Sequence, residues 1–245
     1  MISKAQIKFI KSLQIKKFRQ EHGQFIVQGK KNILELIDSN YSIKQVYATD
    51  TFYSELLTTN VPIETISQKE LEQISSFQSN KTALAIVDIP PNDYIEANND
   101  WVIVLDQVKD PGNLGTIIRI ADWYGVSKLV CSPDCVDSYN PKVINASMGS
   151  FCRVKTYYTA LEPYLAKQKE AIFGALLEGK PIYTSIKPTS GYLLMGSESH
   201  GIAETLKKHI NHQVSIPRLG KAESLNVAVA TAILCDNLLS STLRS

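Results

Sequence analysis

Apolar residues recur along this chain at helical and at strand spacings, and the two spacings alternate. Ser3 and Gln6 have the spacing of a capping box, and Ile7, Ile10 and Leu13 would share one side of the helix that follows. Further helices are predicted at 31–38 and 69–75, and strands at 24–28, 44–48 and 83–87. This alternation predicts a small α/β domain at the N-terminal end.

A turn-rich stretch separates that region from the rest of the chain. Residues 88–100 hold two prolines and many turn formers, so we expect an N-terminal domain over 1–90, a linker over 91–100 and a second domain over 101–245. Residues 101–105 form a continuous apolar run, which is typical of a strand buried on both faces. Further strands are predicted at 128–131, 171–177, 191–195 and 213–216, and helices at 113–124, 141–149, 160–168, 202–208 and 224–240.

Three stretches in the second domain combine the end of an apolar strand with a glycine-bearing loop. They are residues 106–119, 193–201 and 216–228. In an open α/β sheet such loops gather at the carboxyl ends of the strands, where ligands bind. Each loop carries polar residues that a core would not favour, so the three together predict one composite site.

Asn113 and Arg119 are the polar residues of interest in the first stretch. Asn113 follows a Pro-Gly turn, and capping of the next helix is the alternative explanation for it. Arg119 follows six residues later on an apolar helix, where an unpaired buried charge would be costly. A substrate phosphate would satisfy its guanidinium, and a structural salt bridge is the alternative.

The other two stretches offer Glu198 and Asn226. Glu198 lies between Gly196 and Gly201, which free the backbone to approach a ligand, although a capping turn would also explain this composition. Asn226 falls in the first turn of a helix that is apolar nearly all round. Ser199 stands in a near match to a nucleophile elbow, but Ser197 occupies the position of the first glycine.

Composition narrows the classes of function. No apolar run of about 18 residues exists, so no membrane span is expected, and the first residues lack a signal core, so we expect a cytoplasmic protein. Cys131 and Cys135 have no nearby histidine, which favours buried thiols over a metal site. No stretch matches the glycine-rich motifs for dinucleotides or nucleoside triphosphates.

The charge of the chain is nearly balanced at +2, but basic residues crowd its first 31 residues. Lys16, Lys17, Arg19 and Lys30 belong to this cluster, which contains one acid, Glu21. A basic face suits a nucleic-acid backbone, and a solvated helix surface is the alternative.

The three stretches resemble the three motifs of the SpoU, or TrmH, family of RNA 2′-O-ribose methyltransferases in the SPOUT class. Asp110-Pro111, Asn113, Gly115 and Arg119 match the first motif, and Gly196, Glu198 and Gly201 match the second. Ile216-Pro217, Gly220 and residues 224–228 match the third. The likeness covers about residues 100–240. Residues 1–88 are more weakly similar to the substrate-binding domain of ribosomal RNA members, a likeness carried by residues 24–29. The chain departs from many members at two positions, where Gln28 replaces Glu and Arg218 replaces Met.

This resemblance implies a deep trefoil knot, a homodimer and S-adenosylmethionine as methyl donor, with no metal. It implies that Gly196, Ile216 and Leu225 hold the donor, with Leu177 and Gly179 in the same pocket. Arg119 would bind the phosphate beside the target ribose and help to activate its 2′-hydroxyl. Asn113, Glu198, Ser224 and Asn226 would orient the reacting groups, and the N-terminal domain would bind RNA, ribosomal RNA rather than tRNA.

Two other functions fit parts of the sequence. A serine hydrolase built on Ser199 would leave Arg119 and the third stretch unexplained. A non-catalytic RNA-binding protein could keep the same fold, but the polar residues of all three motifs are present. Which RNA and which nucleotide are modified does not follow from the sequence.

Overall fold

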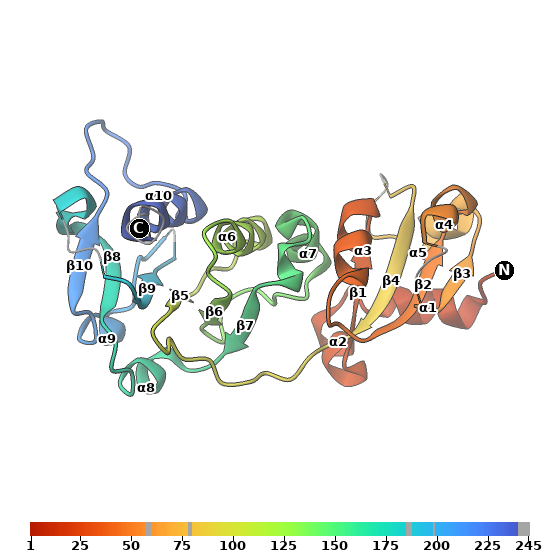
Figure 1. Ribbon diagram of the computed structural model, residues 1–245, viewed down its shortest axis with the longest axis horizontal. Coiled ribbons are helices and arrows are strands. Elements are labelled where there is room, and N and C mark those ends of the chain that lie inside the picture. The colour runs from red at the N-terminus through yellow and green to blue at the C-terminus, as the bar shows by residue number, and fades with distance from the viewer. Residues whose placement is uncertain (57–59, 78–79, 185–187, 198, 240–245) are drawn as a thin grey trace. The chain divides into compact units, whose positions relative to one another are not determined.

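The computed structural model describes residues 1–56, 60–77, 80–184, 188–197 and 199–239. By its internal contacts the chain divides into two compact units. The first consists of Met1–Pro91 and Asp137–Cys152, and the second of Asn92–Val136 and Arg153–Ser245. The chain therefore passes between the units three times. Each unit is an α/β structure, as predicted (Figure 1).

The first unit is built on a four-stranded sheet of order β1-β4-β2-β3, in which only β2 and β3 are parallel. Its strands are β1 (Gln24–Gln28), β2 (Ile43–Ala48), β3 (Ile63–Thr65) and β4 (Ala83–Asp88). Its helices are α1 (Lys4–Ser12), α2 (Lys16–His22), α3 (Lys30–Ile37), α4 (Asp50–Leu56), α5 (Gln68–Ile74), α7 (Pro141–Ser147) and the short 3-10 helix η1 (Ser150–Cys152). One core cluster joins α1 and α5 to the sheet through Ile10, Leu71, Ile26 and Leu84.

The segment 137–152 packs within the first unit although its neighbours in sequence belong to the second. Arg19, on α2, donates from Nη2 to Asp137 at 2.6 Å and from Nη1 to the Leu13 carbonyl at 2.9 Å. Phe25, on β1, packs against Tyr139 and Phe151, with ring centroids 4.7 and 6.3 Å apart. The sequence pattern had assigned this segment to the C-terminal domain.

The second unit is built on a parallel six-stranded sheet of order β10-β8-β9-β5-β6-β7. Its strands are β5 (Trp101–Leu105), β6 (Lys128–Cys131), β7 (Lys155–Tyr158), β8 (Ile172–Pro181), β9 (Gly191–Met195) and β10 (His212–Ser215). Its helices are α6 (Pro111–Trp123), α8 (Leu161–Leu165), α9 (Glu204–Lys207), α10 (Val227–Leu239) and the short 3-10 helix η2 (Ile182–Thr184).

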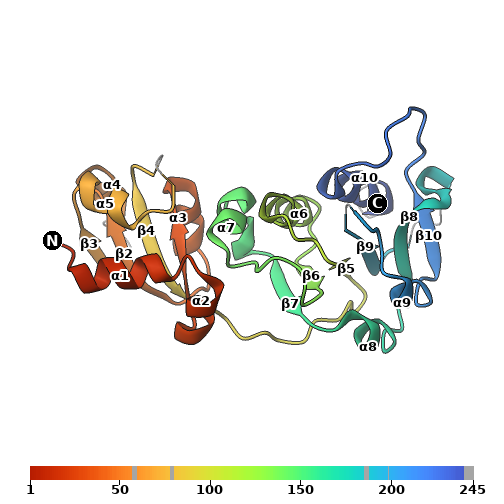
Figure 2. The same ribbon diagram turned by 180° about the vertical axis from the view of Figure 1, so that it is seen from behind.

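Helices cover both faces of this sheet, which explains why its central strands are apolar throughout. Figures 1 and 2 show α6 and α10 on one side of the sheet and α8 and α9 on the other. Alternate residues of β5 serve the two faces, because side chains alternate along a strand. Val102 and Val104 lie in the cluster formed with α8 and α9. The continuous apolar run of residues 101–105 is thus buried on both faces, as predicted.

Residues 92–100, expected to act as part of a linker, pack into the second unit. Ile95 and Ala97 belong to its core cluster, with 8% and 0% exposure. The Tyr164 hydroxyl donates to the Ile95 carbonyl at 2.7 Å, and the Ala97 N–H donates to the Tyr192 hydroxyl at 2.9 Å. The prolines and turn formers therefore mark an ordered, irregular segment rather than a free tether.

Candidate active site

The three motif-bearing loops leave the same edge of the second unit's sheet. They follow β5, β9 and β10, and all six strands of this sheet run parallel. Carboxyl ends of parallel strands lie at one edge, so loops far apart in sequence can meet there. Hydrogen bonds between the loops confirm that they do meet.

The first loop leads into α6, and Asp110 is the residue that caps it. The Asp110 carboxylate accepts from the Asn113 N–H at 2.8 Å, and Pro111 stands at the first helical position, where its missing N–H costs nothing. The alternative that Asn113 caps this helix is therefore wrong. Its side chain contacts a residue outside α6.

Asn113 and Asn226 meet across the site. The Asn226 Nδ2 donates to Asn113 Oδ1 at 2.9 Å, which joins the first and third loops. The Asn226 Oδ1 also accepts from the N–H groups of Ala228 and Val229, at 3.0 and 3.3 Å. One amide thus holds the start of α10 and contacts α6, although 113 positions separate the two asparagines.

Arg119 lies on the exposed face of α6, and the expectation that its charge is buried is wrong. Its neighbours Ile117 and Ile118 are 0% and 1% exposed, so the helix turns its apolar side inward and Arg119 outward. Among the described residues, none forms an ion pair with Arg119. The guanidinium is accessible to an anionic ligand from solution.

Gly179 and Gly196 occupy points of close backbone approach. A Cβ at Gly179 would lie 2.6 Å from the Val214 carbonyl carbon, and one at Gly196 would lie 2.1 Å from that of Gly201. The Ser215 hydroxyl donates to the Gly179 carbonyl at 2.7 Å, so this glycine lies beside the start of the third loop. Glycine is needed at both positions because any side chain would push apart the adjacent backbone.

The remaining predicted donor-binding residues are apolar and only partly covered. Leu177 and Leu225 are 76% and 46% exposed, and Ile216 is half-buried. Ser224, on the third loop, is exposed. Glu198 lies outside the described residues. Ser199 is exposed, and no described histidine side chain is hydrogen-bonded to it, so the geometry gives no support to a hydrolytic serine.

Sequence reasoning missed the residues that fix the first loop. Gln107 has a φ of 58°, a strained value for a residue with a side chain, and its N–H donates to the Ser132 hydroxyl at 2.9 Å. The next N–H, of Val108, donates to Cys135 Sγ at 3.3 Å. Cys131 and Cys135 are buried free thiols, as expected. A hydrogen bond from Cys131 lowers the pKa of Cys135 to about 7, despite burial.

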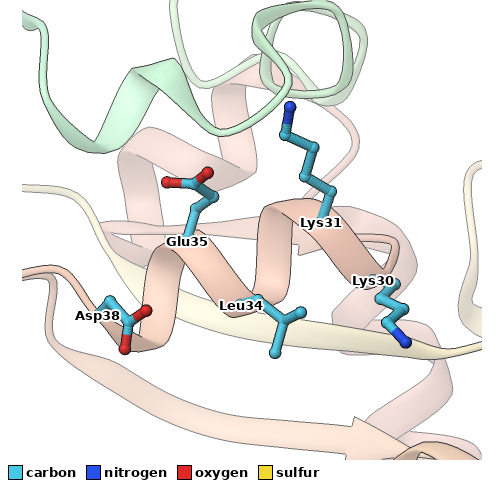
Figure 3. Close-up of a pocket in the computed structure, with 5 residues that line it drawn as sticks. All are labelled: Lys30, Lys31, Leu34, Glu35 and Asp38. Carbon is cyan, nitrogen blue, oxygen red and sulfur yellow. The ribbon is translucent and has the colours of Figure 1, made fainter.

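The basic residues singled out in the first unit differ in exposure. Lys16 and Lys17 are exposed, and Lys30 is paired with Glu55 at 2.8 Å. Lys30 also lines an open hollow along α3, together with Lys31, Leu34, Glu35 and Asp38 (Figure 3). Arg19 is 1% exposed and paired with Asp137, so its assignment as an RNA contact is corrected. Positive charge in a sequence does not show whether the side chain reaches solvent.

Fold and site together define an α/β protein with a composite polar site at the carboxyl edge of a parallel sheet. Residues 100–236 match the model of the SpoU rRNA methylase family, and residues 4–85 match that of the MRM3-like substrate-binding domain. The chain belongs to the SpoU rRNA methylase family.

Similar proteins extend over nearly the whole chain. It is 28% identical over 237 residues to RlmP of Bacillus subtilis, named a 23S rRNA (guanosine(2553)-2′-O)-methyltransferase, and the match covers 95% of each protein. It is 28% identical to a 23S rRNA (uridine(2479)-2′-O)-methyltransferase of Streptomyces viridochromogenes, covering 89% of this chain and 83% of that protein. A TrmH-family structure from Porphyromonas gingivalis is 32% identical, with a TM-score of 0.88, covering 97% of this chain and 98% of the other.

Two further properties concern only the described part of the chain. None of its helices has the length and apolar character needed to cross a membrane. Within the same residues, no group of three or more His, Cys, Asp or Glu side chains is arranged to hold a metal ion.

Proposed function

We propose that the protein transfers a methyl group from S-adenosylmethionine to a ribose 2′-hydroxyl of RNA. The observation that carries this proposal is the Asn226–Asn113 hydrogen bond, which joins the first and third family motifs. Arg119 lies on the same helix as Asn113, is exposed, and forms no ion pair with a described residue. Membership of the SpoU rRNA methylase family and the names of the similar proteins from Bacillus and Streptomyces support it.

The loops around Gly179 and Gly196 suit the methyl donor. S-adenosylmethionine combines apolar and hydrogen-bonding parts, and the glycines let backbone segments approach closely where side chains would intrude. Gly196, Ile216 and Leu225 would hold the donor, with Leu177 and Gly179 in the same pocket. When bound, the donor supplies a methyl group on a positively charged sulfur, which is a good leaving group.

Arg119 would bind the phosphate next to the target ribose. A guanidinium stays protonated at physiological pH and matches a phosphate with two parallel hydrogen bonds. Its positive charge also favours removal of a proton from the 2′-hydroxyl, which is a poor nucleophile while protonated. Asn113, Ser224 and Asn226 would orient the ribose and the loops. Glu198 is proposed for the same role because of its position in the second motif.

Binding of RNA by the first unit is supported by an unusual placement of lysines. Lys4, Lys16, Lys17, Lys30 and Lys31 lie in the first turns of α1, α2 and α3, and none of these turns contains an acid. A cation at a helix N-terminus opposes the helix dipole, by about 0.3–1 kcal/mol. Helix stability therefore does not explain these lysines, whereas phosphate groups would interact favourably with both the ammonium groups and the helix ends.

We propose ribosomal RNA, rather than tRNA, as the substrate. The similar proteins from Bacillus and Streptomyces are both named for 23S rRNA, and they align with the first unit as well as the second. The first unit also matches the MRM3-like substrate-binding domain. The proposed division of labour gives RNA recognition to residues 1–90 and chemistry to residues 101–245, in the cytoplasm.

We further propose a homodimer formed through the second unit, whose catalytic fold contains a deep trefoil knot. α10 buries Val227, Thr231 and Leu234, but leaves Val229 49% exposed on another face. On α6, Trp123 is 82% exposed. A second copy would cover such apolar surface. A sedimentation experiment that finds only monomer at micromolar concentration would contradict this proposal.

The proposed activity is tested by incubating the purified protein with radiolabelled donor and ribosomal RNA from cells that lack it. The product is then digested, and the position of each new methyl group is mapped. We expect one or a few 2′-O-methylated nucleotides in wild-type reactions, and much slower methylation of the same nucleotides by Arg119→Ala. Tight binding to ribosomal RNA without any methyl transfer would instead favour a non-catalytic RNA-binding protein.

A further inference from the structure

The second motif forms a short loop that is closed on itself. Ser197 and Gly201 exchange two backbone hydrogen bonds, of 3.0 and 2.9 Å, and the Ser197 hydroxyl accepts from the His200 N–H at 3.2 Å. Gly196 lies against Gly201 so closely that a Cβ would be 2.3 Å from the N of Ile202. Gly196 and Ser197 therefore lie directly against Gly201 and Ile202, and these four residues form the base of the loop. The position of the loop depends on the contacts that this base makes with the rest of the unit.

Asp106 holds both sides of this base. It is the first residue after β5, and its N–H donates to the carbonyl of Met195, the last residue of β9, at 2.9 Å. Its carboxylate Oδ2 accepts from the N–H of Ala203, on the far side of the loop, at 2.8 Å. One residue of the first motif thus binds the entry and the exit of the second motif.

Burial of the Asp106 carboxylate costs free energy, because its charge is removed from water. Asp106 is 3% exposed, and this burial raises the pKa of its carboxyl. The hydrogen bond from the Ala203 N–H lowers the pKa, whereas the nearby charge of Asp134 raises it further. Asparagine would offer an acceptor of the same shape without a buried charge. A charged acceptor, however, forms a shorter and stronger hydrogen bond than a neutral one, and so fixes the base of the loop more firmly.

We propose that Asp106 is a positioning residue, which fixes the backbone of Gly196 and Ser197 and of Gly201 and Ile202 against the first motif, and so keeps the donor site correctly placed relative to Arg119. The inference rests on the proposed function, because Gly196 is one of the proposed donor contacts. Asp106 itself contacts neither donor nor RNA in this scheme. It acts through the backbone of Met195 and Ala203.

The test compares Asp106→Ala with Asp106→Asn and with a control, Asn211→Ala. Asn211 also accepts a backbone hydrogen bond in the second unit, from the Ile172 N–H at 2.8 Å, but at the start of β8 and not at the site. Donor affinity is measured by calorimetry, and amide hydrogen exchange is followed in peptides covering residues 196–203.

We expect Asp106→Ala to weaken donor binding by about 10-fold or more, the scale of a lost hydrogen bond to a charged group. Asp106→Asn, which keeps an acceptor, should recover most of that affinity, and Asn211→Ala should leave donor affinity unchanged even if it lowers the melting temperature. Exchange at 196–203 should accelerate in Asp106→Ala alone.

If Asp106→Ala does not fold, Ala203→Pro removes the same hydrogen bond from the other side. The φ of Ala203 is −56°, which proline can adopt, and proline has no N–H. Unchanged donor affinity and unchanged exchange at 196–203 in these variants would overturn the role of Asp106. A wild-type chain that does not bind the donor would overturn the proposed function instead, and the exchange experiment would still decide whether Asp106 holds the loop.

Discussion

Arg119 and Arg19 are both arginines on helices with apolar neighbours, and they differ in exposure. Arg19 is 1% exposed, and its guanidinium is bound by Asp137 and by the Leu13 carbonyl. Arg119 is exposed on α6, with no ion pair to a described residue. An arginine whose charge is paired inside the protein stabilises the fold, whereas an exposed one on the helix that carries Asn113 is accessible to a phosphate.

Substitution of Arg119 should change the rate of methyl transfer without changing the affinity for the methyl donor. Arg119→Ala should keep the fold and the donor affinity, because the side chain is exposed, and should lose on the order of 100-fold in methylation rate. Arg119→Lys should recover little, since one ammonium cannot reproduce a two-pronged contact. Single-turnover methylation measures the rate, and calorimetry measures donor affinity as the control. Near-normal turnover by either variant would make Arg119 a structural residue.

Asn226 performs two functions that two substitutions can separate. Asn226→Asp keeps an acceptor for the Ala228 and Val229 N–H groups but loses the donor to Asn113. Asn226→Ala loses both, and removal of such a cap costs about 1 kcal/mol. We therefore expect both variants to lose activity and only Asn226→Ala to lose stability in urea unfolding. Full activity of the aspartate variant would show that the contact with Asn113 is dispensable.

At the residue scale, the sequence predicted which residues lie at the site, but it did not predict the backbone contacts that some of them make. Gly196 was expected to let a ligand approach the backbone, and Gly179 was expected to line the donor pocket. The structure shows that each also lies against other backbone, Gly179 against Val214 of the neighbouring strand and Gly196 against Gly201 of the same loop. Gly179 and Val214 are distant in sequence, so no local pattern could reveal their contact. The contact of Asp106 with Ala203 was missed for the same reason.

At the scale of the element, α5 shows how one acid can join two segments. Ser67 and Glu70 form a capping box, in which each side chain binds the other's backbone N–H. Glu70 also accepts from the Ile2 N–H at 3.0 Å, which ties the start of the chain to α5. Hydrogen bonds from the Ser67 side chain, the Ser67 N–H and the Ile2 N–H lower the pKa of Glu70 to about 2.

This lowered pKa predicts how stability changes in acid. The ionised form is favoured by folding, so its contribution is present above the ordinary value of 4.5 and is lost as pH falls from there towards 2. Glu70→Gln should therefore lower the urea midpoint at pH 6 and have less effect at pH 3. Glu72→Gln removes the same charge from the same helix and serves as the control. An equal effect of Glu70→Gln at both pH values would contradict the assignment.

The elements predicted from sequence were those with long, regular apolar patterns. The strands at 24–28, 101–105, 128–131 and 191–195 match the structure residue for residue. Strands β3 and β7 and helices α2 and α4 were missed. β7 reads Lys-Thr-Tyr-Tyr and is exposed or half-buried at the edge of its sheet, so it needs no alternation of apolar residues. Helix α2 is held by the buried Arg19, which a hydrophobic pattern does not register.

At the scale of the whole molecule, the segment 137–152 belongs to the first unit, although the residues before and after it in sequence belong to the second unit. Removal of residues 1–90 would take away the Arg19 partner of Asp137 and the Phe25 ring that packs on Tyr139 and Phe151. An uncompensated charge and uncovered aromatic rings would result. The two units are therefore less separable than a division at residue 90 implies.

Truncation of residues 1–90 should nevertheless leave the donor site in place, because that site is built from loops of the second unit. We expect the truncated chain to bind S-adenosylmethionine, to methylate its RNA poorly, and to be cut by proteases between residues 137 and 152. Limited proteolysis with mass spectrometry locates the cuts in truncated and full-length chains. Methylation of full RNA at the wild-type rate would show that the first unit does not select the substrate.

The salt dependence of RNA binding tests the charge of the first unit directly. Each phosphate contact releases counterions, so the logarithm of affinity falls with the logarithm of salt concentration by about 0.7 per contact for single strands. Replacing Lys16 and Lys17 by glutamine should therefore weaken binding and reduce the slope by about 1.4. Both side chains are exposed, so this change should not alter the fold.

Two substitutions serve as controls for this experiment. Lys167→Gln with Lys169→Gln removes the same charge from exposed positions of the second unit, and should change the slope less. Arg19→Met should lower stability, because Asp137 loses its buried partner, without the slope change expected of a phosphate contact. Equal slopes for the Lys16/Lys17 variant and the wild type would mean that these lysines form only a solvated surface. RNA would then have to be held by other residues, and the lysines at the starts of the helices would lose their proposed role.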